Sequence, residues 1–541
     1  MKDISSTGSF VDFTLENFIY VDKTVYIPQL VKLKRVFISR PRRFGKSLTL
    51  DTIATLFETG VEPYFKGTWI YDKWTEPTYP VLRLNFLNFD KNTLEKFNNK
   101  LNSKITEFAE LNQVTTYKEK DEAEDSIDHL LEQLRLEGRQ IVILIDEYDC
   151  QMTANINNET LYKQFQEKIK SFYANLKDKF AIKFLGITGV TRLKDVSIFS
   201  VGSDINDITN ASAYSQMIGF TRDEIKKYYI DYLKLASSYE NNCSVDDVTD
   251  TQLESMLDMM AQNYDGYCFD EDYEKKVFST WSVNKFFQTM IEKKKVQFGE
   301  YWYDNGGLPS ILVNYLKTHE LNIFEYLDKD KFLKVSSDDF KNPTALTTIN
   351  QNVLMCQTGY LTLRSDLNKT STVALGIPNG EIYKALNRLL ANNIFKGNTD
   401  ITDDYGRSLL EVGTVDDIIN LFNSALNSVS YDNYPIVSES SVQNMLKLYL
   451  LGAHQEVLSE VHEAKGRADL VVNTDNRRIV FEFKYAKNEA EAKSKLSEAV
   501  EQIKTRDYGN ILPKKNELIR IAAVFNADPK VRAFTENQIV P

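Results

Sequence analysis

Cysteine, histidine and long hydrophobic runs are scarce in this sequence. Only four cysteines occur in 541 residues, and they are scattered without a C-x-x-C pair. This usage argues against a disulfide framework or a zinc knuckle and suits a reducing compartment. The four histidines are equally dispersed. No run of about 18 apolar residues predicts a membrane span, and the first residues lack the apolar core of a secretory signal. We therefore expect a cytoplasmic protein with no membrane partner.

Positive charge is also in short supply. The net charge of −12 argues against a chain that binds nucleic acid with its whole surface. The balance differs from Ser441 onward, where Lys and Arg slightly outnumber Asp and Glu, so a local basic groove near the C-terminal end is permitted. Apolar material is plentiful, with 42% hydrophobic residues, 31 Phe and 29 Tyr. The length predicts roughly three or four domains.

The order of short apolar runs predicts the fold class. Runs typical of strands alternate with helical patterns over the first 220 residues, which favours a mainly parallel α/β sheet covered by helices on both faces. The strand candidates are residues 36–39, 79–86, 141–146, 184–190 and 214–220.

Four further parts of the chain differ in pattern from this alternating region. Residues 221–300 are mainly helical, residues 301–425 are mixed, and the polar stretch 424–441 is typical of a linker. The last part, 441–541, has the order α-β-β-β-α-β and predicts a separate domain.

The stretch VFISRPRRFGKSLTL (36–50) predicts a phosphate-binding loop. Gly45 allows the turn, Lys46 can reach the β- and γ-phosphates, and the Ser47 hydroxyl can hold Mg²⁺ at a helix N-terminus. A strand precedes the loop and an amphipathic helix follows it, with Gly60 as the expected C-cap. GKS alone occurs by chance in many proteins, so a second element is needed.

The stretch IVILIDEYD supplies that second element, because it ends an apolar strand with Asp146 and Glu147. An NTPase needs one acid beside Mg²⁺ and a second acid that activates the attacking water. Farther along, Thr188 ends another strand and could contact the γ-phosphate or the water, and Arg192 could sense its charge. Ordinary strand-end and surface roles are equally compatible with these two residues.

The loop departs from the usual pattern at its start. Arg40 stands where glycine is usual, Pro41 stiffens the chain, and Arg42 and Arg43 follow. We expect Arg42 and Arg43 to add positive charge near the phosphates or to face a partner. The pattern therefore predicts a nucleotide site with a modified entrance.

Together these motifs resemble a bacterial family of AAA-ATPase-like proteins with a C-terminal PD-(D/E)XK nuclease-like domain. The resemblance covers nearly the whole chain, and RPRRFGKS, including its first arginine, is typical of that family. It implies ATP and Mg²⁺ as cofactors, an N-terminal AAA-like domain over 1–220 and a helical lid over 221–300. The segments that carry it include FIYVDKT (18–24), RPRRFGKSL (40–48), LIDEYD (144–149), GITGVTR (186–192), IFSVGSDINDIT (198–209), GFTRDE (219–224) and YDGYCF (264–269).

The C-terminal domain offers GRADLVV and FEFKY as a second site. Glu482 and Lys484 are two residues apart, so they project from the same face of a strand, and Asp469 lies on the preceding strand. Two carboxylates suit Mg²⁺, and a lysine can orient water or stabilise negative charge during phosphodiester hydrolysis. A plain surface Glu–Lys pair is the alternative, and the resemblance favours the nuclease-type site.

Further residues of this domain are weaker candidates. Glu460 could be another metal ligand, although Glu456 and Glu463 compete for that role. Gln502 and Lys504, followed by Tyr508, resemble the Gln…Tyr arrangement that lines substrate in some PD-(D/E)XK enzymes.

The motifs together predict an ATP-binding and ATP-hydrolysing protein that controls a Mg²⁺-dependent nuclease domain, in defence or in DNA processing. Nucleic acid is the expected partner, with DNA favoured over RNA. The alternative is a nucleotide-gated scaffold whose C-terminal domain binds a partner or nucleic acid without cutting. AAA-type ATPases often form rings, so a homo-oligomer stays open.

Overall fold

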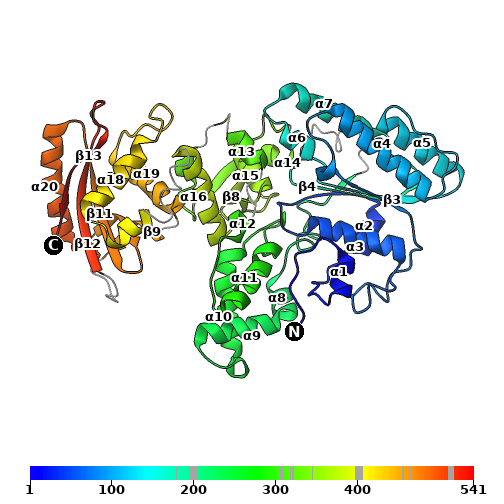
Figure 1. The fold of residues 1–541 in the computed structure, drawn as a ribbon, viewed down its shortest axis with the longest axis horizontal. Coiled ribbons are helices and arrows are strands. Elements are labelled where there is room, and N and C mark those ends of the chain that lie inside the picture. Colours follow the sequence, from blue (N-terminus) through cyan, green and yellow to red (C-terminus); the bar gives the residue numbers. More distant parts are fainter. Residues whose placement is uncertain are drawn as a thin grey trace. The chain divides into compact units, whose positions relative to one another are not determined.

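The computed structural model resolves two compact units, which are described separately (Figure 1). The first comprises residues 1–321 and 330–382, and the second comprises residues 322–329 and 383–541. The structure describes residues 1–177, 179–193, 205–304, 310–316, 319, 322–343, 345–395, 406–453, 456–463, 466–509 and 517–541.

A five-stranded parallel sheet forms the centre of the first unit. Its spatial order is β2-β3-β4-β1-β5, and every neighbouring pair is parallel. All six residues of β3 are buried, as expected for a central strand that is covered on both faces. The parallel α/β prediction is therefore confirmed. The strands are β1 (Arg35–Ser39), β2 (Val81–Asn85), β3 (Ile141–Asp146), β4 (Ile182–Gly189) and β5 (Asn206–Asp207).

Helices cover both faces of this sheet (Figure 1). The helix α3 (Lys46–Thr59) lies on one face, and α4 (Leu94–Leu111), α5 (Ala123–Leu136) and α7 (Glu159–Ala174) lie on the other. The C-cap of α3 is Gly60, with φ of 73°, as its sequence predicts. Shorter elements complete the region: α1 (Phe10–Leu15), η1 (Thr24–Tyr26), α2 (Ile27–Leu33), η2 (Phe86–Asn88) and α6 (Cys150–Ala154).

The strand expected at 214–220 is wrong. This segment forms consecutive turns, and the fifth strand is β5 instead. Its apolar side chains are buried in a turn next to the sheet, so its sequence has the apolar residues that are also typical of a buried strand. Gly219 has φ of 110°, a left-handed value that a continuous strand does not contain.

The region 221–300 is helical, as expected. Two of its helices begin with capping boxes. Thr221 and Glu224 form the capping box of α8, and Thr249 and Gln252 form that of α10. The helices bury an apolar cluster that also includes Ile19 from the N-terminal segment. They are α8 (Arg222–Tyr228), α9 (Ile230–Asn241), η4 (Val245–Asp247), α10 (Asp250–Tyr264) and α11 (Thr280–Lys293).

The region 301–382 mixes helices with a small antiparallel sheet of order β6-β8-β7. It is divided at 322–329, which contain η5 (Ile323–Glu325) and belong to the second unit. The four-part division expected from the sequence is finer than these two units and stays a prediction. The elements are α12 (Tyr301–Asp304), α13 (Ser310–Leu316), β6 (Leu333–Ser336), α14 (Ser337–Lys341), α15 (Gln351–Gln357), β7 (Thr362–Leu363) and β8 (Thr372–Gly376).

The second unit contains the predicted α-β-β-β-α-β order and one further strand. Its sheet has the order β13-β12-β11-β10-β9, in which only the pair β11 and β12 is parallel. The elements are α16 (Gly380–Ile394, which starts in the first unit), α17 (Arg407–Val412), α18 (Val415–Asn427), α19 (Glu439–Gly452), β9 (Glu456–Glu463), β10 (Gly466–Asn473), β11 (Arg477–Ala486), α20 (Glu489–Arg506), β12 (Glu517–Asn526) and β13 (Ala533–Ile539).

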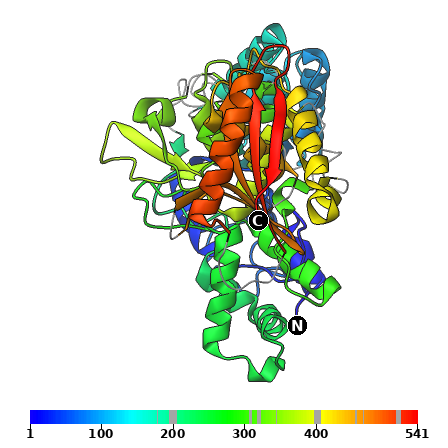
Figure 2. The same ribbon diagram turned by 90° about the vertical axis from the view of Figure 1, so that its left-hand side faces the viewer.

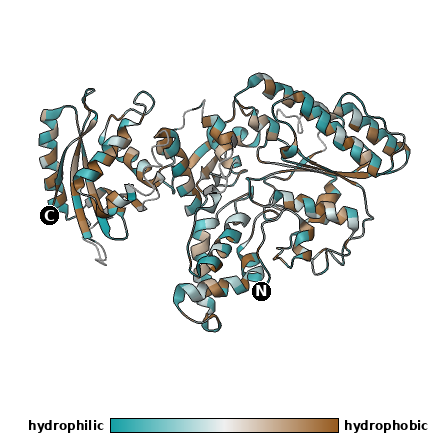
Figure 3. Cartoon of the chain, in the orientation of Figure 1, coloured by the Kyte–Doolittle hydropathy of each residue, from teal (hydrophilic) through white to brown (hydrophobic). Residues whose placement is uncertain are grey.

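The second unit corrects one sequence boundary. The linker expected over 424–441 overlaps the end of α18 and the start of α19, so the non-helical stretch is 428–438. Figure 2 shows α20 lying along the sheet beside β12 and β13, and Figure 3 shows apolar residues along the strands of the larger sheets. No helix in the described part of the chain is both long and apolar enough to cross a membrane.

Candidate functional site

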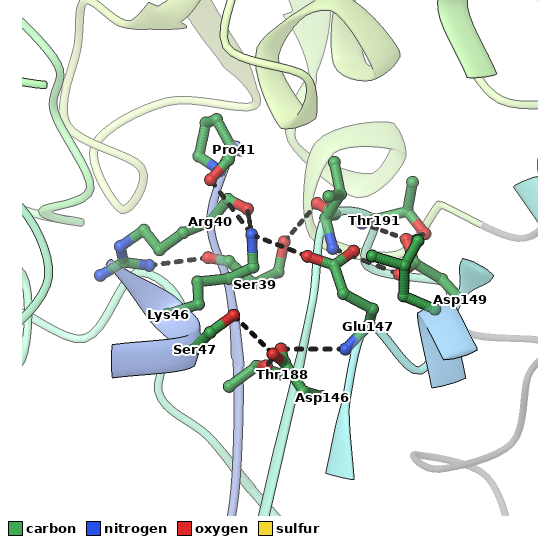
Figure 4. Close-up of polar contacts among 12 residues, drawn as sticks. Ser39, Arg40, Pro41, Lys46, Ser47, Asp146, Glu147, Asp149, Thr188 and Thr191 are labelled. Atoms are coloured by element: carbon green, nitrogen blue, oxygen red, sulfur yellow. Dashed lines mark hydrogen bonds and ion pairs between the residues drawn. The ribbon is translucent and has the colours of Figure 1, made fainter. Parts of the chain in front are cut away.

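The lysine of the predicted phosphate-binding loop is the first residue of α3, directly after Gly45. Gly45 has φ of 102°, which the tight turn requires and which glycine adopts without strain. The Lys46 side chain is 4% exposed, and its Nζ donates to the carbonyl oxygens of Arg40 at 3.0 Å and Pro41 at 3.2 Å (Figure 4). It also lies 3.6 Å from Oε1 of Glu147. The ammonium is therefore fixed at the carboxyl end of β1.

Asp146 joins three elements at the same edge of the sheet. Its Oδ2 accepts a 2.6 Å hydrogen bond from the Ser47 hydroxyl, and its Oδ1 accepts from the Thr188 hydroxyl of β4 (Figure 4). The backbone N–H of Glu147 donates to Oδ1 at 3.0 Å. The structure thus brings Ser47 and Asp146, the two residues that the sequence predicts around Mg²⁺, together with Thr188, which the sequence predicts near the γ-phosphate or the attacking water. Hydroxyl and carboxylate oxygens are the ligands that a hard cation takes.

Glu147 follows the end of β3 with φ of 52°, a left-handed value that is uncommon for a residue with a side chain. Burial raises the pKa of its carboxyl group, while the charge of Lys46 opposes that shift. A raised pKa brings a carboxylate closer to the value that suits a general base near neutral pH. The geometry therefore fits the role that the sequence predicts for Glu147.

Arg40 is a buried structural residue, a role that sequence reasoning missed. Its side chain is 1% exposed, and its guanidinium donates to the carbonyl oxygens of Ser39 and Thr209. It lies 4.2 Å from the ring centre of Phe269. Burial lowers the pKa of Arg40 to about 9, with the charge of Asp207 opposing, so the cation is kept at neutral pH. The arginine in place of glycine fastens the loop to its surroundings.

The two following arginines have different environments. Arg42 lines the cavity beside the loop. Arg43 has φ of 69°, and its guanidinium donates to the carbonyl oxygens of Tyr301 at 2.8 Å and Trp302 at 3.1 Å. It also lies 4.6 Å from the ring centre of Trp281. Arg43 therefore links the loop to the residues after the helical region, although it lines the same cavity.

The segment after β4 is held by Asp149, which sequence reasoning also missed. Its Oδ2 accepts hydrogen bonds from the backbone N–H and the hydroxyl of Thr191, at 2.7 and 2.6 Å. The next residue, Arg192, forms an ion pair with Asp207 of β5. Its side chain is not part of the described lining of the cavity. A charge-sensing role for Arg192 stays a prediction.

A cavity of about 370 Å³ opens beside the loop. Its lining includes Tyr20, Lys23 and Thr24 from the YVDKT motif, a segment whose role the sequence left unexplained. Lys23 Nζ is held by the carbonyl oxygen of Gln216 at 2.7 Å and by Glu224 at 2.6 Å. The cavity therefore joins the N-terminal motif, the phosphate-binding loop and the start of the helical region, and it is large enough for the base and sugar of a nucleotide.

The second candidate site lies on β10 and β11. The antiparallel register pairs Leu470 with Phe481, so position 469 lies across from position 482. Oδ2 of Asp469 accepts a 2.8 Å hydrogen bond from the Phe483 N–H. Lys484 Nζ lies 2.8 Å from Oε1 of Glu482. The structure therefore brings Asp469, Glu482 and Lys484 together on one face of the sheet.

The charges of this site are buried and coupled. Glu482 is fully buried, and burial, followed by the charge of Asp469, raises its pKa to about 7. Burial also raises the pKa of Asp469. Lys484 is 6% exposed; burial lowers its pKa, but Glu482 outweighs that effect and the net shift is upward. The ammonium therefore stays charged beside two carboxyl groups.

One oxygen of Glu482 shows that the donor set fits a divalent cation. Its Oε2 is buried without a hydrogen-bond partner in the described part of the chain. Such an oxygen is costly unless a cation or a proton satisfies it. Asp469 and Glu482 would hold the cation through carboxylate oxygens. Among the described side chains, no group of three or more His, Cys, Asp and Glu residues forms a metal cluster.

Two acids near this pair differ in what the structure describes. Position 460 of β9 lies across from position 469 by the strand register, but the side chain of Glu460 is outside the described residues, as are those of Glu456 and Glu463. Glu439, in the first turn of α19, lies 3.4 Å from Lys484 Nζ. Sequence reasoning missed Glu439 because it precedes the motif by an entire helix and strand.

The helix α20 presents only part of the expected substrate-lining set. Gln502 is half-buried, and its Nε2 donates to the Tyr508 hydroxyl at 3.4 Å. Tyr508 is fully buried in the apolar cluster under α20. Lys504 is exposed and lies about 200° around the helix from Gln502, so these two side chains do not share a face. Arg506, which also donates to the Tyr508 hydroxyl at 2.7 Å, was not expected.

Three known proteins are similar to this chain at low sequence identity. The chain is 26% identical over 535 residues to an uncharacterized protein in the vnfD 5′ region of Azotobacter chroococcum mcd 1, covering 95% of this chain and 94% of that protein. Two solved structures are similar at low level. Cdc6p from Pyrobaculum aerophilum has a TM-score of 0.22 and 11% identity, covering 66% of this chain and 88% of that chain. Aeropyrum pernix Orc1, in complex with DNA, has a TM-score of 0.27 and 10% identity, covering 71% and 97%.

Two family models match separate parts of the chain. Residues 5–199, which contain the phosphate-binding loop and the Asp146–Glu147 strand end, match the predicted AAA-ATPase model. Residues 437–535, which contain Asp469, Glu482 and Lys484, match the PD-(D/E)XK nuclease superfamily model. The chain therefore joins a predicted AAA-ATPase-like domain to a C-terminal domain of the PD-(D/E)XK nuclease superfamily.

Proposed function

We propose that this protein binds and hydrolyses ATP and thereby controls a Mg²⁺-dependent domain that cleaves nucleic-acid phosphodiesters. The observation that carries the proposal is a shared arrangement. In each of the two candidate sites, a buried lysine lies beside a carboxylate that follows a β-strand or lies within one. The distance is 3.6 Å between Lys46 and Glu147 and 2.8 Å between Lys484 and Glu482. Buried lysines next to acids are expensive unless a phosphate or metal chemistry uses them.

The first site would take the nucleotide with its triphosphate at the start of α3. Lys46 can exchange its bonds to the loop carbonyls for bonds to phosphate oxygens, and the helix N-terminus favours the same negative charge. Ser47 and Asp146 would hold Mg²⁺, which neutralises charge on the phosphates when it is bound. Glu147 accepts the proton of the attacking water, and its raised pKa makes it a better base than an exposed glutamate.

The cavity beside the loop would take the base and sugar. Its lining joins Tyr20 and Ile27 on the N-terminal segment to Tyr229 and Trp281 on the helical region. An aromatic and aliphatic lining suits a flat heterocycle. Nucleotide binding would therefore connect the N-terminal segment with the region 221–300, which gives hydrolysis a way to change their arrangement.

The second site would hydrolyse a phosphodiester. Asp469 and Glu482 would hold Mg²⁺, which supplies an activated water and neutralises charge on the phosphate when it is bound. Lys484 stays protonated and can donate to a phosphate oxygen as negative charge develops. Gln502 and Arg506, which both donate to the Tyr508 hydroxyl, would contact the polyanion from α20. We infer a cytoplasmic role in defence or DNA processing, with DNA as the first substrate to test ahead of RNA.

A plasmid-cleavage assay with Mg²⁺ and ATP tests the proposal. The variants Lys46→Ala, Glu147→Gln and Asp469→Ala separate nucleotide binding, hydrolysis and cutting. We expect the wild-type chain to cut, Asp469→Ala to lose cutting while keeping ATP hydrolysis, and the two ATPase variants to lose the dependence of cutting on ATP. Cutting that disappears with Asp469→Ala but continues unchanged without ATP would show that the sites are not coupled.

A nucleotide-gated scaffold is the second candidate, and the additional contact of Lys484 with Glu439 favours it. Lys484 Nζ lies within 3.4 Å of Glu439 as well as 2.8 Å from Glu482, so its charge is already balanced within the domain. In that case ATP would rearrange the protein to recruit a partner, and the C-terminal domain would only bind. Normal ATP binding without cleavage of any nucleic acid, under any metal condition, would support this candidate instead.

A further inference from the structure

A basic groove lies at the edge of the first unit's sheet that is opposite to the phosphate-binding loop. Its volume is about 720 Å³, the largest among the cavities described above and here. Arg35 starts β1, Ile182 starts β4 and Gln140 precedes β3, so the groove lies at the amino ends of these parallel strands. The nucleotide residues lie at their carboxyl ends, about 15 Å away along β1, at about 3.3 Å per residue.

The lining of this groove has an unusual charge for a chain of net charge −12. Among the described residues it contains six Lys or Arg side chains and one carboxylate, Glu76. The basic residues come from three separate segments of the sequence, so the charge run at 32–35 supplies only half of them. They are Lys32, Lys34, Arg35, Lys73, Lys179 and Lys183.

Internal ion pairs account for only part of this charge. Lys183 pairs with Glu76 at 2.7 Å, and Lys179 pairs with Asp128. Lys32 and Lys34 are exposed and form no ion pair with any residue in the described ranges. Lys73 is exposed as well; its Nζ donates to the Trp69 carbonyl at 3.1 Å and lies 4.4 Å from the Trp69 ring centre. Three lysines therefore offer charge to an anionic partner.

Aromatic side chains accompany these lysines. Phe180 lines the groove and is 63% exposed, so its ring is accessible to a partner. Trp74 lines the same groove, and Trp69, beside Lys73, is 40% exposed. Exposed aromatic rings between lysines are the arrangement that binds single-stranded nucleic acid, because bases stack on rings while ammonium groups contact phosphates. An acidic protein segment would use the lysines but would have less need of the rings.

We propose that this groove, lined by Lys32, Lys34, Lys73 and Phe180, binds single-stranded nucleic acid on the ATPase unit, separately from the nuclease-type site. The inference goes beyond the proposed function, because it concerns binding by another part of the chain and needs no cleavage. The strand β1 connects the groove at Arg35 to the loop at Ser39 and Arg40, so a bound strand and a bound nucleotide share one structural element.

Fluorescence polarisation measures the affinity of the full chain for a labelled thirty-nucleotide oligothymidine and thereby tests this groove. The buffer contains EDTA so that no cutting occurs. The variant is Lys32→Gln with Lys34→Gln. The matched control is Lys96→Gln with Lys100→Gln, two exposed lysines of α4 outside the groove. We expect the groove variant to bind roughly tenfold more weakly than the control at 0.1 M salt, with a slope of log K against log salt that is smaller by about 1.4, since each lost phosphate contact removes about 0.7.

A second variant, Phe180→Ala, tests stacking, and we expect it to weaken binding with little change in the salt slope. ATP binding by each variant reports that the first unit is folded. Equal affinity and slope in the groove variant and the control would overturn the inference. So would a groove variant that loses affinity for poly-L-glutamate but keeps it for the oligonucleotide, because the partner would then be an acidic protein. Cleavage by the wild-type chain in Mg²⁺ is a separate result that this binding assay does not decide.

Discussion

The Ser47 hydroxyl donates a 2.6 Å hydrogen bond to Oδ2 of Asp146, and this bond joins the first turn of α3 to the end of β3. The two residues are 99 positions apart in the chain. Their contact places the phosphate-binding loop next to the acids of the neighbouring strand end. Lys46 directly precedes Ser47 in the sequence, and Glu147 directly follows Asp146. The same arrangement holds Lys46 Nζ and Oε1 of Glu147 3.6 Å apart.

Lys46 should mainly affect ATP binding, and Glu147 should mainly affect ATP hydrolysis. We expect Lys46→Ala to weaken ATP binding by about ten- to a hundredfold, because one charged hydrogen bond contributes about 1.5–3 kcal/mol. Glu147→Gln keeps the shape of the side chain but removes the base, so hydrolysis should fall by about 10²- to 10⁴-fold with nearly unchanged affinity. Fluorescent-nucleotide titration and phosphate release measure the two quantities. A Glu147→Gln chain that hydrolyses ATP at the wild-type rate would exclude this role.

The buried guanidinium of Arg40 should be necessary for the stability of the first unit. The guanidinium donates through Nη1 to the carbonyl oxygens of Ser39 and Thr209 and through Nη2 to that of Tyr214. A lysine ammonium has one nitrogen and cannot reproduce this set, so we expect Arg40→Lys to cost about 3 kcal/mol of unfolding free energy. Differential scanning fluorimetry should show a thermal midpoint lower by roughly 5–10 °C.

Arg135→Ala is the matched control for that experiment. Arg135 is exposed on α5 and pairs only with Glu132 one turn away among the described residues, so its loss should leave the thermal midpoint nearly unchanged. Equal midpoints for the two variants would show that the Arg40 contacts contribute little.

Metal binding at the second site should depend on pH. Burial raises the pKa of Glu482 to about 7, well above its value in the unfolded chain, so a proton competes with Mg²⁺ below neutral pH. Affinity for Mg²⁺ should therefore rise between pH 5 and 8 and level off above the pKa. Without metal, the same group lowers stability as pH rises from its unfolded value through about 7, because the folded state binds the proton more tightly.

Isothermal titration of Mg²⁺ into a Lys46→Ala chain measures this dependence without nucleotide. Proton release, obtained by repeating the titration in two buffers, should be largest below pH 7. Glu482→Gln should remove both the proton release and most of the affinity. Affinity that is flat from pH 5 to 8 in the parent chain would contradict a proton on Glu482.

Lys484 should act in catalysis more than in metal binding. We expect Lys484→Ala to reduce cleavage by about 10²-fold or more, the range seen when one group that stabilises transition-state charge is removed. Its Mg²⁺ affinity should stay within a few fold of the wild-type value, whereas Asp469→Ala should lose both properties. A Lys484→Ala chain that cuts normally would indicate that the Glu482–Lys484 pair serves stability only.

The sequence predicted the elements of the fold whose pattern is local. The strands that end at Ser39, Asp146 and Gly189 are short apolar runs, and their order with GKS and DE predicts the candidate nucleotide site at the ends of these strands. The prediction of a strand at 214–220 was wrong because this segment forms turns next to Arg40, and its apolar side chains are buried there. A turn has no periodic pattern that the sequence could reveal. Over only seven residues, a buried turn and a strand can have the same apolar composition.

Residues that act through distant contacts could not be predicted. Arg40 reads as an exposed cation in RPRR, yet its partners lie 169 residues later at Thr209 and in the ring of Phe269. Glu439 reaches Lys484 across 45 residues. The lysines of the basic groove belong to three segments that only the tertiary fold brings together. Such contacts follow from tertiary packing and leave no spacing in the sequence.

Cleavage of a mixed panel of single- and double-stranded DNA and RNA, with and without Mg²⁺, tests the central claim most directly. The account predicts Mg²⁺-dependent cutting of at least one member by the wild-type chain, loss of that cutting in Asp469→Ala with ATP binding intact, and altered cutting when Lys46 is replaced by alanine. No cutting of any member by a chain that binds both ATP and Mg²⁺ normally would contradict it.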